Sequence, residues 1–217
     1  MMKIVIIGGV AGGMSAATRL RRLNEDAEII VLEKGPFVSF ANCGLPYYIS
    51  GDIQERSDLL VQTPEQLRAR FDLDVRPFSE AIAIDADKKE VTVRSKEGDY
   101  QLAYDKVILS PGAKPFVPPA EGLSEAKNIF TMRNVPDVDA VTGFILENNP
   151  KKAVVIGAGF IGLEMAESLA HRGLTVTIVE KAPHVLPPFD EEMAAYLADE
   201  LRANGVTLYT GVAATAF

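Results

Sequence analysis

The sequence contains only one cysteine, two histidines and no tryptophan among its 217 residues. A single cysteine cannot form an internal disulfide, and together with two histidines it supplies too few ligands for a typical zinc site. No apolar run approaches the roughly 20 residues that a membrane-spanning helix needs. These absences indicate a protein of a reducing compartment, and we expect it to be cytoplasmic, without a metal site and without membrane contact.

Basic residues are also in the minority, because the formal net charge is −8. Binding to a nucleic acid backbone or to an anionic membrane needs a broad basic surface. We therefore expect no nucleic acid partner, and any polyanionic ligand must be bound by a local group of cations. The hydrophobic content of 47% is ample for packed cores.

A strand, turn, helix and strand pattern occurs twice in the chain, and its second copy is the clearer one. The segment Lys152–Ile156 leads into a glycine-rich turn and a helical pattern over Leu163–Arg172, followed by Thr175–Val179. A carboxylate at the end of that last segment accepts hydrogen bonds from an adenosine ribose and repels a 2′-phosphate, which favours NADH over NADPH. Lys181, next to the carboxylate, weakens that preference. The residues of this dinucleotide-binding fingerprint are Gly157, Gly159, Gly162 and Glu180.

The first copy runs from Lys3–Ile7 through a helical pattern over Met14–Leu23 to Glu28–Leu32, which ends in Glu33. Its turn consists of Gly8, Gly9, Val10, Ala11, Gly12 and Gly13. Val10 stands where the middle glycine is expected, but a helix N-terminus can still bind a pyrophosphate there. One such match could be a plain strand-to-helix turn. Two such matches in one chain, each with strand, helix and acid in order, predict two bound nucleotides and an electron relay. Normally the first match binds FAD and the second a nicotinamide.

Three short alternating segments between the copies predict an antiparallel meander. They are Ser79–Ile84, Glu90–Arg94 and Tyr100–Ala103. Val107–Leu109 then re-enters the core, and the proline-rich stretch 115–122 marks a crossover. We predict an α/β protein of two Rossmann-like, three-layer domains: an FAD-binding domain over 1–113 with the meander inserted, and an NAD(P)-binding domain over 114–217. We expect both to be incomplete at the C-terminal end, with no dimerisation domain in this chain.

Cys43 follows the first acidic strand end by a short loop. The polar Ser39 and Asn42 make Asn42 or Cys43 a plausible start of a helical turn, and a helix N-terminus stabilises a thiolate over a thiol. A redox nucleophile needs that thiolate. The alternative is a buried structural cysteine, which is the commoner fate of a lone cysteine. The position just after a flavin-type fingerprint favours the redox role.

These motifs resemble the single-cysteine branch of the pyridine nucleotide-disulfide oxidoreductases, above all coenzyme A disulfide reductases and NADH-dependent persulfide reductases. The resemblance rests on the segments 6–13, 39–48 and 109–113 and covers essentially the whole chain. Two-cysteine members carry a CxxxxC pair, but Tyr48 occupies the fifth position after Cys43. The resemblance therefore implies that Cys43 cycles through a mixed disulfide, a persulfide or a sulfenic acid.

The resemblance also implies FAD and NADH as cofactors, with NADPH less favoured, and a homodimer for the full-length protein. Cofactor contacts are implied for a set of residues beyond the two fingerprints. They are Lys34, Asn42, Ser110, Pro111, Gly112, Phe160, Ile161 and Glu164. Phe160 corresponds to an aromatic gate over the flavin and Glu164 to a carboxylate on the nicotinamide side. Plain packing or helix capping explains these two residues nearly as well.

Coenzyme A disulfide or persulfide is the substrate that the resemblance implies. A coenzyme A thiol carries a phosphorylated ADP, and Arg19, Arg21 and Arg22 form the densest basic group of the chain. Arg19 and Arg22 share a helix face, because they are three residues apart. The coenzyme A contacts of the family correspond to Ser15, Arg19, Arg22, Ser39 and Asn42. A solvated helix face is the alternative interpretation.

Two other functions remain open at this point. NADH peroxidases and water-forming NADH oxidases also resemble the chain, but they carry a histidine in the first glycine turn, where this chain has Ala11. Neither His171 nor His184 can take that place in the sequence, and we expect both at the surface. The missing acid disfavours peroxide reduction. The second alternative is a non-catalytic nucleotide-binding fragment or redox sensor.

Overall fold

The computed structural model describes residues 1–216. Phe217, the last residue of the predicted second domain, lies outside the described part. None of the helices within 1–216 is long and apolar enough to cross a lipid bilayer.

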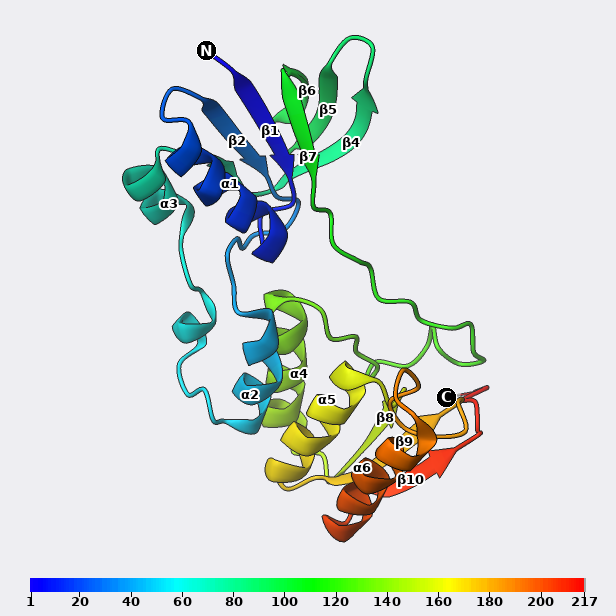
Figure 1. The fold of residues 1–217 in the computed structure, drawn as a ribbon. Helices are drawn as coiled ribbons and strands as arrows, with labels where there is room; N and C mark the ends of the chain where they lie inside the picture. The colour runs from blue at the N-terminus through cyan, green and yellow to red at the C-terminus, as the bar shows by residue number, and fades with distance from the viewer. Residues whose placement is uncertain (217) are drawn as a thin grey trace. The chain divides into compact units, whose positions relative to one another are not determined.

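The chain divides into two compact units, which are described separately (Figure 1). Unit 1 comprises Met1–Ala41 and Ser57–Lys114. Unit 2 comprises Asn42–Arg56 and the chain from Pro115 onward, so the segment that carries Cys43 groups with the second unit. The assignment of separate FAD and NAD(P) domains remains a prediction about function.

The elements follow one another along the chain as two βαβ patterns with a meander between them (Figure 1). Up to the meander they are β1 (Lys3–Ile7), α1 (Ala11–Leu23), β2 (Glu28–Leu32), η1 (Asn42–Gly44), α2 (Leu45–Ser50), η2 (Arg56–Leu59), α3 (Pro64–Phe71) and β3 (Asp74–Arg76). The rest are β4 (Ser79–Asp85), β5 (Glu90–Ser95), β6 (Gly98–Ala103), β7 (Lys106–Leu109), α4 (Val135–Asn148), β8 (Lys152–Ile156), α5 (Phe160–His171), β9 (Thr175–Glu180), α6 (Glu191–Ala203) and β10 (Thr207–Thr210).

Unit 1 contains a parallel sheet in the order β3-β2-β1-β7, with a core on each face. Successive side chains of a strand point to opposite faces, so alternate residues of β1 and β2 enter different cores. Ile4 and Ile6 pack with α1 and α3, whereas Val5 packs with Val91 and Val93 of the meander. Helices, parallel sheet and meander form the three layers that the sequence predicted.

Unit 2 contains a parallel sheet in the order β10-β9-β8. α5 packs against β8 and β9, α6 packs against β10, and α2 packs against both α4 and α5. Val176 and Ile178 of β9 are buried in this unit. The predicted Rossmann-like α/β class is confirmed for both units.

The predicted starts of the two fingerprint helices are wrong by three residues. α1 begins at Ala11 and not at Met14, and α5 begins at Phe160 and not at Leu163. The glycine turns themselves wind into the first helical turn, because Met14 N–H donates to Val10 O at 2.9 Å and Leu163 N–H donates to Gly159 O at 3.0 Å. The low helix propensity of glycine is overridden by the packing of the turn.

Two helices outside the predicted elements start with capping boxes. In α3, the Thr63 side chain accepts from Gln66 N–H and the Gln66 side chain accepts from Thr63 N–H. Asn134 and Asp137 make the same reciprocal pair at the start of α4. Both helices also carry proline in the first turn, where a missing N–H costs nothing. These were the local signals that could have predicted both helices.

Candidate functional site

The first glycine turn depends on a close approach between α1 and the end of β1. Gly8 has a φ of +105°, and its N–H donates to Leu32 O at 2.8 Å. A Cβ on Gly13 would lie 1.8 Å from the carbonyl oxygen of Gly8. No side chain fits at that distance, so Gly8 is fixed by its backbone conformation and Gly13 by space.

The second glycine turn has the same geometry in unit 2. Gly157 has a φ of +100°, and its N–H donates to Val179 O at 2.8 Å. A Cβ on Gly162 would lie 2.0 Å from the carbonyl oxygen of Gly157. Each turn therefore brings the N-terminus of a helix onto a strand end, an arrangement whose free N–H groups bind phosphate oxygens.

The middle position of the fingerprint does not require glycine by conformation. Val10 has a φ of −109° and Gly159 a φ of −77°, so neither residue lies in the left-handed region that favours glycine. In the first turn the steric requirement falls one residue earlier, because a Cβ on Gly9 would lie 2.9 Å from the Cβ of Glu33 and 2.9 Å from Val38 Cγ1. Valine at position 10 is therefore compatible with a nucleotide-binding turn. The close packing that excludes a side chain is found at Gly9 instead.

Glu33 ends β2 beside the first turn. One carboxylate oxygen accepts from Gly9 N–H at 2.8 Å and the other accepts from Gly35 N–H at 2.7 Å. Each oxygen can accept more than one hydrogen bond, so the fixed carboxylate keeps acceptor capacity for a ribose hydroxyl. The side chain is positioned by the backbone before any ligand binds.

Glu180 occupies the equivalent place in unit 2 and is only 9% exposed. Its two oxygens accept from Ala158 N–H and Ala182 N–H, each at 2.6 Å. A carboxylate held in this way repels a phosphate on the ribose. The fingerprint residues of both units thus fit the pyrophosphate and ribose of a nucleotide.

The segment 110–112 closes the first turn from the β7 side. Ser110 N–H donates to Ile7 O at 2.8 Å, and a Cβ on Gly8 would lie 1.9 Å from Ser110 O. Ser110 Oγ is the nearest atom to the position of a Cβ on Gly12, at 3.4 Å. Pro111 and Gly112 follow at the exposed end. The structure therefore brings this predicted segment next to the glycine turn.

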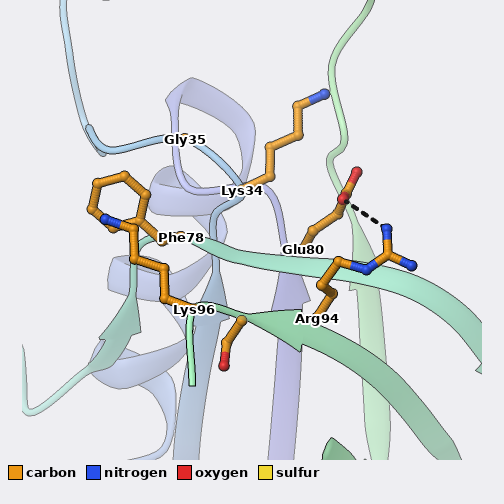
Figure 2. A pocket seen from close by; sticks show the side chains of 7 residues that line it. Lys34, Gly35, Phe78, Glu80, Arg94 and Lys96 are labelled. Carbon is orange, nitrogen blue, oxygen red and sulfur yellow. Dashed lines mark ion pairs between the residues drawn. The ribbon is translucent and has the colours of Figure 1, made fainter. Parts of the chain in front are cut away.

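An open pocket of about 500 Å³ lies between the residues after β2 and the meander (Figure 2). Its lining residues are Lys34, Gly35, Phe78, Glu80, Arg94, Ser95 and Lys96. The Lys96 ammonium lies 3.4 Å from the ring centroid of Phe78, and Arg94 lies 3.9 Å from Glu80. Three cations face one acid, so the pocket suits a polar or anionic ligand part; only Lys34 of this set was predicted from the sequence.

A second pocket of about 300 Å³ lies between α1 and α3, and we call it the α1–α3 pocket. It is lined by Met14, Ser15, Thr18, Ser39, Gln62, Leu67, Arg70 and Phe71. Two predicted substrate residues, Ser15 and Ser39, meet here. Arg70, whose guanidinium lies 5.2 Å from the Phe71 ring centroid, was missed because nothing in the sequence places α3 beside α1. Arg19 and Arg22 do not line this pocket, although both are exposed on α1.

Cys43 is an exposed free thiol in the 3-10 turn η1, so the predicted helical turn at Asn42 or Cys43 is confirmed. Asn42 is half-buried, and within residues 1–216 its Oδ1 has no hydrogen-bond partner. A buried acceptor without a donor is costly. Asn42 Oδ1 is therefore an unused acceptor next to Cys43, but it is buried in this structure, so the contact of Asn42 with a ligand stays a prediction.

The Cys43 segment is held within unit 2 by an arginine at its end. Arg56 donates from Nε and Nη2 to the two oxygens of Asp139 in α4, at 2.6 and 2.7 Å. This bond raises the pKa of Arg56 above its ordinary value. Arg172 donates to Ile49 O at 3.2 Å from the end of α5. The first contact fixes the end of the Cys43 segment to α4, and the second holds α2, which directly follows η1.

The remaining predicted residues lie around α5. Phe160 is 57% exposed at the start of α5, with its ring centroid 6.0 Å from that of Phe189, and Ile161 is also exposed. Glu164 is half-buried one turn further on. His171 is exposed, as expected, whereas His184 is half-buried, with its Nδ1 2.8 Å from Val185 O. Among residues 1–216, no cluster of side chains is suited to a metal ion.

The sequence matches the family described as pyridine nucleotide-disulphide oxidoreductase over residues 2–217. A coenzyme A disulfide reductase of Staphylococcus haemolyticus is 42% identical over 209 residues, which cover 95% of this chain and 46% of the relative.

Two solved structures are similar throughout this chain. The crystal structure of reduced Bacillus anthracis CoADR-RHD has a TM-score of 0.94 and 53% identity, covering 96% of this chain and 38% of that one. The structure of a NAD-dependent persulfide reductase from A. fulgidus has a TM-score of 0.94 and 37% identity, covering 99% of this chain and 40% of that one. The chain thus spans less than half the length of these proteins.

Replacing Gly13 or Gly162 by alanine is expected to impair one proposed nucleotide site at a time. The added Cβ forces α1 or α5 away from its strand, which costs about 1–3 kcal/mol of stability and weakens nucleotide binding about tenfold or more. Gly13→Ala should reduce FAD content measured from the flavin absorbance, whereas Gly162→Ala should weaken NADH binding in a fluorescence titration.

Gly143→Ala is the matched control, because Gly143 lies inside α4 with open space around its Cβ position. It should retain both cofactors and be neutral or slightly stabilising. Normal FAD content in Gly13→Ala would contradict the assignment of the first turn.

Asp139→Ala is expected to loosen the Cys43 segment. It removes a bidentate but partly exposed ion pair, so we expect a loss of about 1 kcal/mol in the free energy of unfolding and faster amide exchange over residues 43–50. Asp199→Ala, which breaks the exposed pair with Arg202 in α6, is the control. Equal exchange over 43–50 in both variants would show that Asp139 does not anchor this segment.

Proposed function

Because the chain belongs to the pyridine nucleotide-disulphide oxidoreductase family, we propose that it forms the cofactor-binding part of an FAD-dependent enzyme that uses NADH to reduce a small disulfide or persulfide through Cys43. The single observation that carries this proposal is an exposed cysteine in a helical turn, in a chain that also holds two nucleotide-type glycine turns. The lone exposed thiol favours a reducing, cytoplasmic location. The family resemblance favours a homodimer of the whole protein.

The two glycine turns take different nucleotides in this proposal. The first turn, with Glu33 and the segment 110–112, binds FAD, and the second turn, with Glu180, binds NADH. FAD bound at the first turn would supply the redox chemistry that passes two electrons from a nicotinamide to a sulfur–sulfur bond. The buried carboxylate of Glu180 supports NADH over NADPH, because a ribose 2′-phosphate would meet a fixed negative charge.

Cys43 acts as the nucleophile. Its thiolate attacks one sulfur of the substrate disulfide, a new sulfur–sulfur bond forms to Cys43, and the other half leaves as a thiolate that takes up a proton. Cys43 is then restored as a thiolate when its mixed disulfide takes up two electrons, which the bound cofactors would supply, and the second thiol leaves after protonation. One NADH and its accompanying proton therefore convert one disulfide into two thiols.

The α1–α3 pocket supports a nucleotide-bearing thiol such as coenzyme A. Ser15 and Ser39 supply hydroxyl groups, and Arg70 supplies a guanidinium suited to phosphate oxygens. Arg19 and Arg22 add positive charge on the exposed face of α1. A local cation group of this kind is what an acidic chain needs to bind a polyanion.

Cys43→Ser is expected to abolish the reduction of coenzyme A disulfide, with a loss of at least about 1,000-fold in kcat, because serine cannot form the mixed disulfide. Bleaching of the flavin absorbance by NADH should persist, since hydride transfer does not use the thiol. Both are measured on the FAD-loaded protein by anaerobic spectrophotometry, with free thiol quantified after NADH addition.

The outcomes of this experiment separate the three candidate functions. Thiol production retained by Cys43→Ser would refute the role of Cys43. NADH-driven oxygen uptake without any thiol substrate would identify an NADH oxidase. Flavin bleaching without turnover of any disulfide in the wild type would indicate a redox sensor.

The double variant Arg19→Ala/Arg22→Ala should raise the KM for coenzyme A disulfide about tenfold or more. The KM for pantethine disulfide, which lacks the nucleotide phosphates, should change less than about twofold. Lys114→Ala/Lys127→Ala removes the same charge at two exposed positions and serves as the control. Equal effects on both substrates would remove these arginines from the binding site.

A further inference from the structure

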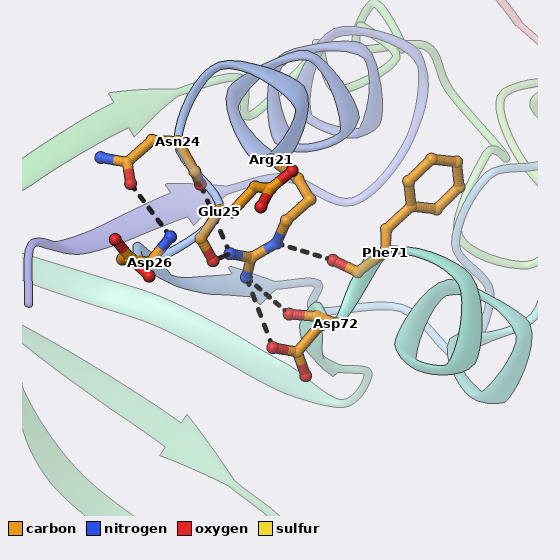
Figure 3. Close-up of polar contacts among 6 residues, drawn as sticks. All are labelled: Arg21, Asn24, Glu25, Asp26, Phe71 and Asp72. Carbon is orange, nitrogen blue, oxygen red and sulfur yellow. Dashed lines mark hydrogen bonds and ion pairs between the residues drawn. The ribbon is translucent and has the colours of Figure 1, made fainter.

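Arg21 differs from its two neighbours on α1, although the sequence groups the three together. Its side chain is only 12% exposed, and its guanidinium is occupied by backbone carbonyl groups (Figure 3). Arg19 and Arg22 are exposed, and within the described part of the chain neither forms a hydrogen bond or ion pair. Arg21 therefore lacks the free guanidinium that phosphate binding requires.

The guanidinium of Arg21 joins two separate chain segments. Nε donates to Phe71 O at 2.8 Å, and Nη2 donates to Asp72 O at 2.8 Å. Nη1 donates to Glu25 O at 2.5 Å and to Asn24 O at 3.4 Å (Figure 3). The carbonyl groups of Phe71 and Asp72 lie at the C-terminal end of α3. Those of Asn24 and Glu25 follow the C-terminal end of α1.

These acceptors are groups that helices leave unsatisfied. The last carbonyl groups of an α-helix have no partner within the helix, and α3 ends at Phe71 with Asp72 as its C-cap in the left-handed region, at a φ of 47°. The Asp72 carboxylate lies 3.9 Å from Arg21 but is 93% exposed, so its contribution is small. The fork of Arg21 is therefore the main polar link at this end of α3.

The position of this link matters for the α1–α3 pocket. α1 contributes Met14, Ser15 and Thr18 to the lining, and α3 contributes Leu67, Arg70 and Phe71. Arg70 and Phe71 are the last residues of α3, directly beside the carbonyl groups that Arg21 binds. The bonds of Arg21 therefore lie directly beside the α3 wall of the pocket.

We propose that Arg21 is a positioning residue for the substrate pocket: it fixes the last turn of α3 against α1, so that Arg70 faces the same ligand as Ser15 and Ser39. The inference rests on the proposed use of the α1–α3 pocket for coenzyme A. Arg21 itself does not touch the ligand. Only the planar fork of arginine can reach carbonyl groups of both segments at once, whereas lysine offers a single ammonium.

This requirement for a fork distinguishes positioning from direct phosphate binding. If Arg21 bound a phosphate through its charge, Arg21→Lys would preserve most of the affinity. If Arg21 holds two segments together, Arg21→Lys should lose almost as much affinity as Arg21→Ala. Because lysine keeps the charge and the aliphatic stem, Arg21→Lys also provides a milder variant should Arg21→Ala fold poorly.

The test is isothermal titration calorimetry of coenzyme A into the FAD-loaded protein. We expect both Arg21→Lys and Arg21→Ala to raise the Kd for coenzyme A about tenfold, with FAD content and the far-ultraviolet circular dichroism spectrum as in the wild type. Arg202→Lys, at an exposed arginine that pairs with Asp199 of the same helix, is the matched control and should leave the Kd unchanged. Arg70→Ala, measured in parallel, reports whether coenzyme A uses this pocket.

Each other outcome overturns the inference. Wild-type affinity for coenzyme A in Arg21→Lys would contradict the inference. If Arg70→Ala nevertheless raised the Kd, the proposed substrate site would still be supported. A normal Kd in Arg70→Ala would refute both the pocket assignment and the role of Arg21. Loss of FAD in parallel with loss of coenzyme A affinity would indicate a general structural role and would also overturn the inference.

Discussion

In each unit a helix approaches a strand end with no side chain between them. In unit 1 Gly13 lies against the carbonyl group of Gly8, and in unit 2 Gly162 lies against that of Gly157. This approach directs the N–H groups of each helix N-terminus to one point, where a phosphate can be bound. The other residues of each proposed nucleotide site are arranged around that point.

Glu33, Glu180 and Cys43 are positioned by different contacts around these turns. Glu33 and Glu180 are fixed by backbone N–H groups of the turns themselves, so the ribose end of each site is rigid before a ligand arrives. Cys43 belongs to a short segment that is anchored through Arg56 to the compact unit of the second turn. The thiol and the proposed nicotinamide site therefore share one unit, although the chain places Cys43 soon after the first turn.

Much of the fold could be predicted because hydrophobic periodicity and glycine spacing are local signals. The bounds of β1, β2 and β8 agree with the predicted segments, and Gly173 follows α5 with a φ of +89°, as expected for a helix end. The start of α1 was predicted too late because the packing of Gly13 against Gly8 and Ile6 outweighs the low helix propensity of glycine. Arg70 and the role of Arg21 could not be predicted, since both depend on α3 lying beside α1, a contact between segments about 50 residues apart that no local pattern encodes.

In the proposed function, Cys43 receives the electrons that enter at the second turn. Intact-protein mass spectrometry tests it most directly: the FAD-loaded protein is treated with coenzyme A disulfide, freed of excess reagent, and measured before and after one equivalent of NADH under anaerobic conditions. The expected result is the added mass of one coenzyme A thiol at Cys43, which is lost on addition of NADH. An adduct that persists after NADH, or no adduct at Cys43, would contradict it.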